Sequence, residues 1–130
     1  MNGPVGIVLV SHSAGLAAGL RELLAQIGSA AVPVVAAGGS ADGGIGTSYD
    51  LVAEAIDKAD QGAGVAVLPD LGSSVLTTRT VLEDHPRADV AIIDAPFVEG
   101  AVAAAVTAAA GGDLHAVISA AEEARDVRKF

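Results

Sequence analysis

Four short apolar runs of strand length, each followed by a segment with helical spacing, constrain the fold of this chain most strongly. The runs span residues 5–10, 32–36, 64–68 and 88–93 and are rich in β-branched side chains. A continuous apolar run of this length is typical of a strand buried on both faces of a parallel sheet. Segments with helical periodicity follow at 14–28, from Thr47 or Ser48 onward, at 74–84 and at 98–110, and a last one begins after residues 111 and 112.

The alternation of strand and helix predicts an α/β fold, a doubly wound, mostly parallel four-stranded sheet with helices on both faces. Right-handed crossovers leave few topologies for such a chain and favour the strand order 2-1-3-4. At 130 residues the chain is expected to form one domain, residues 1–130. Pro33 has no amide hydrogen to donate, so we expect it near the start of its strand or on an edge strand.

The charge and the aromatic content argue against a nucleic-acid-binding protein. The formal net charge is −9, with 7 lysines and arginines, and aromatic residues make up 2% of the chain. Binding to a phosphate backbone requires clustered basic residues, and binding to single strands uses stacked aromatic side chains. The acidic balance has two interpretations, solubility alone or an acidic face that docks a basic partner.

The absence of cysteine removes disulfides, thiolate metal sites and cysteine nucleophiles from consideration. The longest apolar stretches are of strand length or rich in alanine, so no membrane-spanning segment is expected. No histidine or carboxylate spacing typical of a metal site occurs, and the residues imply no cofactor. The expected location is the cytoplasm.

The most specific feature is a histidine and an aspartate that follow two strands predicted to be neighbours. His12 follows the first apolar run and Asp70 follows the third. In an open α/β sheet, ligands bind at the carboxyl ends of the strands, where the strand order reverses, here between the first and third strands. A carboxylate that accepts a hydrogen bond from one ring nitrogen fixes the tautomer of a nucleophilic imidazole. The pair predicts His12 as a nucleophile that Asp70 orients.

Small and hydroxyl-bearing residues near the predicted helix starts complete a candidate anion site. Helix N-termini present backbone N–H groups to an anion, and serine and threonine add side-chain donors. The residues assigned to phosphate binding are Ser13, Gly46, Thr47, Gly72, Ser73 and Ser74. The glycine-rich loop 38–46 matches neither a P-loop nor a dinucleotide-binding motif.

Each of these residues also has a purely structural interpretation. A histidine after a strand can be a packing or capping residue, an aspartate there can cap the next helix, and glycine–serine pairs are ordinary in turns. Their convergence on one crevice favours a functional site. His85, before Pro86, and His115, near the start of the last helix, are weaker candidates, and His115 is expected on the surface.

Five segments in order resemble one known family. They read VLVSHS at 8–13, AAG at 36–38, IGT at 45–47, DLGSS at 70–74 and APFVEG at 95–100. With these motifs the chain resembles the phosphotransferase subunits (DhaM) of phosphoenolpyruvate-dependent dihydroxyacetone kinases. Their domain is similar to the mannose-type enzyme IIA of the sugar phosphotransferase system (PTS).

The resemblance implies a phosphotransferase function that depends on partner proteins. In such proteins the histidine matching His12 accepts a phosphoryl group from the carrier HPr, and the aspartate matching Asp70 hydrogen-bonds it in the mannose-type relatives. The phosphoryl group then passes to ADP on the nucleotide-binding subunit of dihydroxyacetone kinase. The resemblance also implies a homodimer and, at residues 127–130, a C-terminal antiparallel strand exchanged between protomers. No HPr-like domain follows within this sequence, so the donor is expected to be a separate protein.

Two alternative functions stay open from the sequence. A mannose-type sugar PTS enzyme IIA component would use the same chemistry with a different acceptor. A non-catalytic regulatory partner module would bind a kinase or transcription factor through its acidic face. The sequence SHS around His12 and LGS after Asp70 favour the dihydroxyacetone branch over mannose-type proteins, which read Thr-His-Gly and have a tryptophan–glycine turn there.

Overall fold

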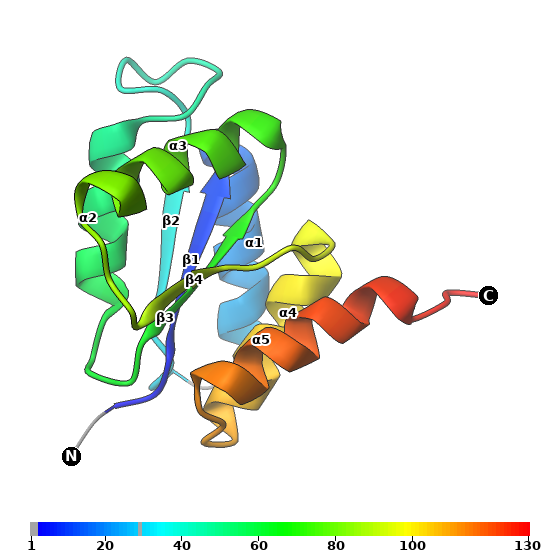
Figure 1. Ribbon diagram of the computed structural model, residues 1–130. Helices are drawn as coiled ribbons and strands as arrows, with labels where there is room; N and C mark the ends of the chain where they lie inside the picture. The colour runs from blue at the N-terminus through cyan, green and yellow to red at the C-terminus, as the bar shows by residue number, and fades with distance from the viewer. Residues whose placement is uncertain (1–2, 29) are drawn as a thin grey trace.

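The computed structural model describes residues 3–28 and 30–130, which form four strands and five α-helices in strict alternation until the end of the chain (Figure 1). The elements are β1 (Gly6–Ser11), α1 (Ala14–Ile27), β2 (Val34–Gly38), α2 (Tyr49–Ala59), β3 (Val65–Pro69), α3 (Gly72–Asp84), β4 (Val90–Ile92), α4 (Phe97–Ala109) and α5 (Leu114–Glu123), followed by a 3₁₀ turn (Ala124–Asp126).

The four strands form one parallel sheet in the order β2-β1-β3-β4, which confirms the predicted topology. Strand β1 lies between β2 and β3, and all six of its residues are buried. Alternate side chains of β1 therefore enter two different cores. Ile7 and Leu9 pack with α1, α4 and α5 on one face, and Val8 and Val10 pack with α2 and α3 on the other.

Pro33 and His85 lie at the start of β2 and at the end of α3, respectively. Pro33 lies just before β2, which is an edge strand, and its carbonyl accepts a hydrogen bond from the Ile7 amide at 2.8 Å. Both parts of the prediction for Pro33 are confirmed. His85 ends α3, with its amide donating to the Val81 carbonyl at 2.9 Å.

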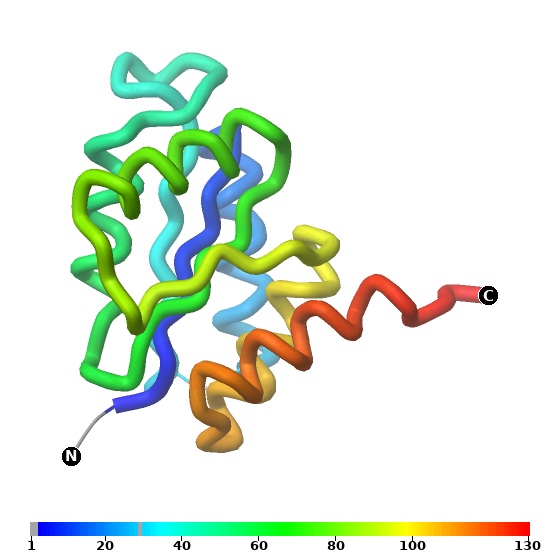
Figure 2. The backbone as a smooth tube through the Cα atoms, viewed as in Figure 1, coloured from blue at the N-terminus to red at the C-terminus, as the bar shows by residue number. Residues whose placement is uncertain are grey.

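The expected C-terminal antiparallel strand is not present among the described residues. Residues 127–130 have no regular secondary structure and extend away from the sheet (Figure 2). Val127 and Phe130 are exposed, and Lys129 pairs with Glu99 of α4 at 3.3 Å. A strand requires a neighbour to satisfy its backbone groups, and the described residues offer the tail none.

Gly38, at the end of β2, packs directly against the backbone at the start of α1. A Cβ atom on Gly38 would lie 2.6 Å from the Ser13 carbonyl oxygen and 2.7 Å from the Ala14 Cα. Any side chain here would push the start of α1 away from the sheet. Glycine is therefore required at position 38 by packing against backbone.

We expect Gly38→Ala to lower the free energy of unfolding by about 1–3 kcal/mol, because the methyl group cannot fit against the α1 backbone. Gly19→Ala is the matched control, since nothing lies within 4 Å of its added Cβ and alanine favours a helix. Urea denaturation of both variants measures the difference. Equal stability of the Gly38→Ala variant and the original protein would contradict the packing argument.

Candidate functional site

The carboxyl ends of β1 and β3 bring His12 and Asp70 together, as the order of the strands requires. Val10 of β1 pairs with Pro69 of β3, and the Asp70 amide donates to the Val10 carbonyl at 3.0 Å. His12 and Asp70 thus lie side by side although 58 positions separate them. The structure places this predicted pair in direct contact.

The His12 imidazole has one nitrogen on Asp70 and the other directed toward hydroxyl groups. Its Nδ1 lies 3.1 Å from Asp70 Oδ1 and 3.3 Å from Ser74 Oγ, and its Nε2 contacts Ser73 Oγ. A proton on Nδ1 satisfies the carboxylate and leaves the Nε2 lone pair to accept from the Ser73 hydroxyl. The side chain of His12 is 21% exposed, so Nε2 belongs to a partly open site.

Asp70 accepts hydrogen bonds from several donors besides the imidazole. Oδ1 accepts from Ser74 Oγ at 2.6 Å and from the Leu71 amide at 2.7 Å. Oδ2 accepts from Ser11 Oγ at 2.8 Å and from the His12 amide at 3.2 Å. Its side chain is 8% exposed, so the protein rather than water solvates this carboxylate.

These donors lower the pKa of Asp70. Burial of the carboxyl raises its pKa, whereas the hydrogen bonds from the two serines, the imidazole and the Leu71 amide lower it. The donors prevail, and the pKa of Asp70 falls from 3.8 to about 2. The carboxylate is therefore charged at neutral pH and available to stabilise positive charge on the imidazole.

The Nε2 atom of His12 contacts one hydroxyl group, that of Ser73, and a second hydroxyl group lies behind it. Ser73 Oγ contacts Thr47 Oγ1 at 3.0 Å, which links the start of α3 to the loop before α2. Leu71 occupies the N-cap of α3 without a side-chain hydrogen bond. The Ser74 amide donates to the Leu71 carbonyl at 3.0 Å, so the amides of Gly72 and Ser73 are the ones in this turn that can meet an anion. Helix α3 begins at Gly72, two residues earlier than predicted, which puts Ser73 and Ser74 in its first turn.

Two of the residues assigned to phosphate binding are engaged in local structure. Ser13 caps α1, its Oγ accepting from the Leu16 amide at 3.2 Å. The Gly46 amide donates to the His12 carbonyl at 3.0 Å. Gly46 has a φ of 142°, a conformation that favours glycine, so it orients the loop against His12.

Sequence reasoning missed the role of Ser11. Its buried hydroxyl donates to Asp70 Oδ2 and accepts from the Ser13 amide at 3.1 Å. Ser11 therefore links Asp70, which follows β3, to the residue that caps α1. A serine as the last residue of an otherwise apolar strand was the available signal. A buried hydroxyl at that position needs a partner, and the facing strand end supplies a carboxylate.

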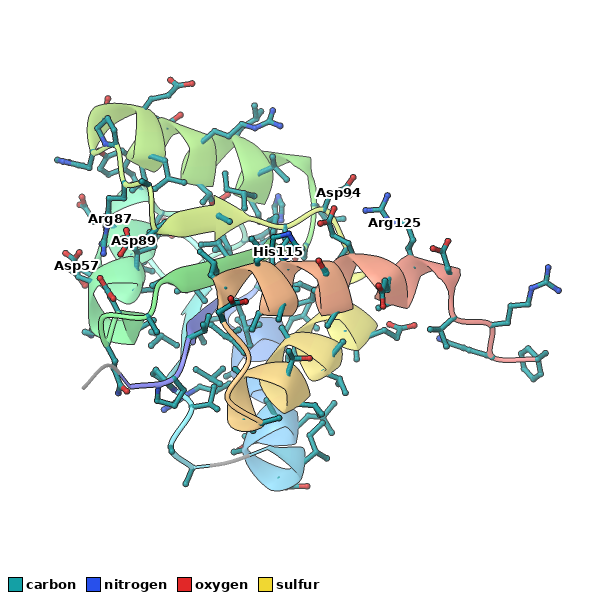
Figure 3. The ribbon with its side chains drawn as sticks, turned by 60° about the horizontal axis from the view of Figure 1, so that its bottom comes forward. Asp57, Arg87, Asp89, Asp94, His115 and Arg125 are labelled. Atoms are coloured by element: carbon teal, nitrogen blue, oxygen red, sulfur yellow. The ribbon has the colours of Figure 1, made fainter. Side chains whose placement is uncertain are left out.

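His115 and Arg87 lie apart from this group. Figure 3 labels His115 on α5, where it is exposed as predicted, and Arg87 beside Asp57 and Asp89. Arg87 joins the end of α2 to the segment before β4 through ion pairs of 3.1 Å to Asp57 and 3.5 Å to Asp89. Residues 3–28 and 30–130 contain no group of three histidines or acidic side chains able to hold a metal, and no helix long and apolar enough to cross a bilayer.

We expect Asp70→Asn to remove a pH-dependent part of the stability. Because the pKa of Asp70 is depressed, its contribution is present above pH 3.8 and is lost as the pH falls through about 2. The shift corresponds to about 2 kcal/mol. In urea denaturation, the free energy of unfolding should fall less between pH 5 and about pH 2 in Asp70→Asn than in the original protein.

Ser74→Ala provides the graded comparison, because it removes one donor to Asp70 and leaves the carboxylate in place. Its loss of stability on acidification should lie between those of the original protein and Asp70→Asn. An identical pH dependence in all three proteins would rule out the depressed pKa.

Comparison with known proteins places this geometry in a family. The family model described as "PTS system fructose IIA component" (EIIA-man) matches residues 6–118. A "PEP-dependent dihydroxyacetone kinase 2, phosphoryl donor subunit DhaM" of Listeria innocua is 33% identical over 117 residues, which cover 88% of this chain and 94% of the relative. The corresponding DhaM subunit of Escherichia coli is 36% identical over 96% of this chain, which spans 28% of that longer protein.

Solved structures agree with the sequence relatives. The crystal structure of EF1359, a protein of unknown function, is 31% identical and superimposes with a TM-score of 0.84, covering 92% of this chain and 94% of that one. A sigma-54 interaction domain protein from Enterococcus faecalis has a TM-score of 0.68 over 97% of this chain and 93% of its own, at 14% identity, and so shares the fold. The match over residues 6–118 and the DhaM relatives show that this chain belongs to the EIIA-man family of phosphotransferase-system components.

Proposed function

We propose that this protein is a phosphohistidine carrier that delivers phosphoryl groups to dihydroxyacetone kinase. In this proposal His12 accepts the group from HPr and passes it to ADP bound to the nucleotide-binding subunit of the kinase. The proposal rests on the contact between His12 Nδ1 and Asp70. This contact leaves Nε2 facing the Ser73 hydroxyl on the open side of the site. The similarity to phosphoryl donor subunits supports this choice of acceptor and a cytoplasmic location.

The transfer step needs little rearrangement of the site. The Nε2 lone pair of His12 attacks phosphorus, the bond from phosphorus to the donor nitrogen breaks, and the donor imidazole leaves with its electron pair. The Nδ1 proton stays on the ring, where Asp70 balances the positive charge that develops. Ser73 gives up its hydrogen bond to Nε2, and its hydroxyl donates to a phosphoryl oxygen instead.

The protein acts in this scheme as a carrier, and the kinase performs the chemistry on its substrate. Thr47 hydrogen-bonds Ser73, which contacts Nε2, and in this proposal it supports the phosphoryl group through Ser73. Ser74, which was also assigned to phosphate binding, donates to Asp70 on the Nδ1 side of the ring. Catalysis then consists of positioning and stabilisation of charge.

A second candidate acceptor follows from the family model, which is described as a fructose IIA component. A sugar-transporting enzyme IIA would use His12 in the same way and discharge to a sugar-specific PTS component. Incubation of the phosphorylated protein with each acceptor distinguishes the two functions. Discharge to ADP on the dihydroxyacetone kinase subunit supports the first.

His12→Ala should abolish phosphorylation by phosphoenolpyruvate, enzyme I and HPr, because no other group in the site offers the nucleophilic nitrogen. The original protein should gain an acid-labile phosphate, measured by intact mass and by loss after acid treatment. His85→Ala and His115→Ala are matched controls outside the site, and both should be phosphorylated normally. Labelling of the His12→Ala variant would refute the assignment, and formation of no phosphoprotein at all would favour the regulatory module.

We also propose that the protein is a homodimer, as the family resemblance implies. Val127 and Phe130 in the tail are 72% and 110% exposed, so a second copy would bury apolar surface that the monomer leaves in water. Light scattering should give twice the mass of one chain. Phe130→Ser should shift the equilibrium toward the monomer, whereas Leu23→Ser on α1 should not, and the opposite pattern would exclude the tail from the interface.

A further inference from the structure

A cavity lies between the second half of α1 and the start of β2, apart from the candidate site. Its volume is about 670 Å³, which is within the range of pockets that hold small organic ligands. The buried side chains of Leu24, Val32 and Ala105 form part of its lining. Ala18 and Ala25 of α1 also line it, and their small side chains leave the space open. A ligand that fills this cavity therefore needs an apolar chain.

The start of β2 leaves backbone groups free at the open edge of the sheet, where Val34 lines the cavity. The Pro33 carbonyl accepts from the Ile7 amide of β1 at 2.8 Å. Because the polar groups of successive strand residues point to alternate sides, Val34 directs both its amide and its carbonyl away from β1. Within residues 3–28 and 30–130 the Val34 amide has no hydrogen-bond partner.

Arg21 places a positive charge on the same edge. Its Nε donates to the Val34 carbonyl at 3.0 Å, which holds the guanidinium group against β2. No carboxylate in the described part of the chain forms an ion pair with Arg21. Glu22 also lines the cavity, but neighbouring positions on a helix do not face each other. The guanidinium group and the Val34 amide thus offer donors to one anionic group.

We propose that this cavity is a binding site for a small amphipathic acid, a carboxylate that carries an aliphatic chain. The chain would lie against Leu24, Val32 and the alanines, and the carboxylate would accept hydrogen bonds from Arg21 and from the Val34 amide. The planar guanidinium group matches a carboxylate in geometry and charge. The inference is independent of the proposed function of His12, because it uses no residue of the candidate site.

The lining favours an acid over an amine. Arg21 is fixed to the sheet by Val34, whereas Glu22 has no hydrogen bond or ion pair to hold its side chain within the described residues. A fixed group loses less conformational entropy when a ligand binds. The Val34 amide is a further donor, and an ammonium group, which has donors alone, cannot use it.

Calorimetric titration of the 130-residue chain with three probes tests the class of ligand. Octanoate should bind with one molecule per chain. Acetate has the charge without the chain, and its Kd should be at least about tenfold higher, because it leaves the apolar lining in water. Octylamine at pH 7 has the same chain with the opposite charge, and its Kd should also be at least about tenfold higher.

Charge variants test whether Arg21 holds the carboxylate. Arg21→Gln should raise the Kd for octanoate about tenfold, because a charge-assisted hydrogen bond is lost. Glu22→Gln should lower this Kd, because it removes a like charge from the lining. Arg79→Gln is the matched control, since it removes the same charge from α3 and Arg79 lines a different cavity.

A filling variant tests the place of the chain. Ala25→Leu should prevent octanoate binding, because the added side chain occupies the cavity. Position 25 is exposed on α1 and leucine favours a helix, so the variant is expected to fold. Gln26→Leu adds the same side chain at the next exposed position, outside the lining, and should bind octanoate normally. Circular dichroism checks that both variants are folded.

The other outcomes overturn the inference. If octanoate does not bind the original protein, or binds Arg21→Gln and Ala25→Leu with an unchanged Kd, the cavity is not a site for amphipathic acids. Tighter binding of octylamine that is lost in Glu22→Gln would assign the cavity to cationic ligands instead. Phosphorylation of His12 is measured separately, so this inference can fail while the proposed function stands, and the reverse also holds.

Discussion

The hydrogen bonds to the Asp70 carboxylate are the interaction on which the candidate site depends. Donors reach it from the end of β1, through Ser11 and His12, and from the start of α3, through Leu71 and Ser74. One buried negative charge therefore fixes the relative positions of two strand ends, a helix and an imidazole. Neutralising that charge would remove the reason for these donors to converge, so the folding of this edge and the chemistry of His12 share one cause.

The fold could be predicted because its signals are local and mutually consistent. Each strand is a short apolar run because both faces of the sheet are covered, and each crossover is a helix because parallel neighbours need a long connection. The order β2-β1-β3-β4 follows from handedness, and it is the order that brings His12 to Asp70. The contact between these two residues could therefore be predicted from the strand order alone, without comparison with a homologous protein.

The finer geometry was not predictable, because it depends on distances that no sequence pattern encodes. Ser11 could have been an ordinary buried serine, and only the facing carboxylate makes it part of the site. The start of α3 at Gly72 moves Ser73 onto Nε2, while Ser13 and Gly46 use their polar groups in a cap and in a bond to the His12 carbonyl. The tail differs from these cases, because the antiparallel strand expected at residues 127–130 is not present among the described residues, which offer it no neighbouring strand.

Holding the phosphoryl group with hydroxyls and amides suits a carrier better than holding it with cations. A lysine or arginine fixed beside His12 would stabilise the phosphorylated state and make the group harder to pass on. In the proposed function, neutral donors such as Ser73 and Thr47 would orient the group at a smaller cost to its release. In the same proposal the negative charge of Asp70 would stabilise a positively charged imidazole both when His12 accepts the phosphoryl group and when it gives the group up.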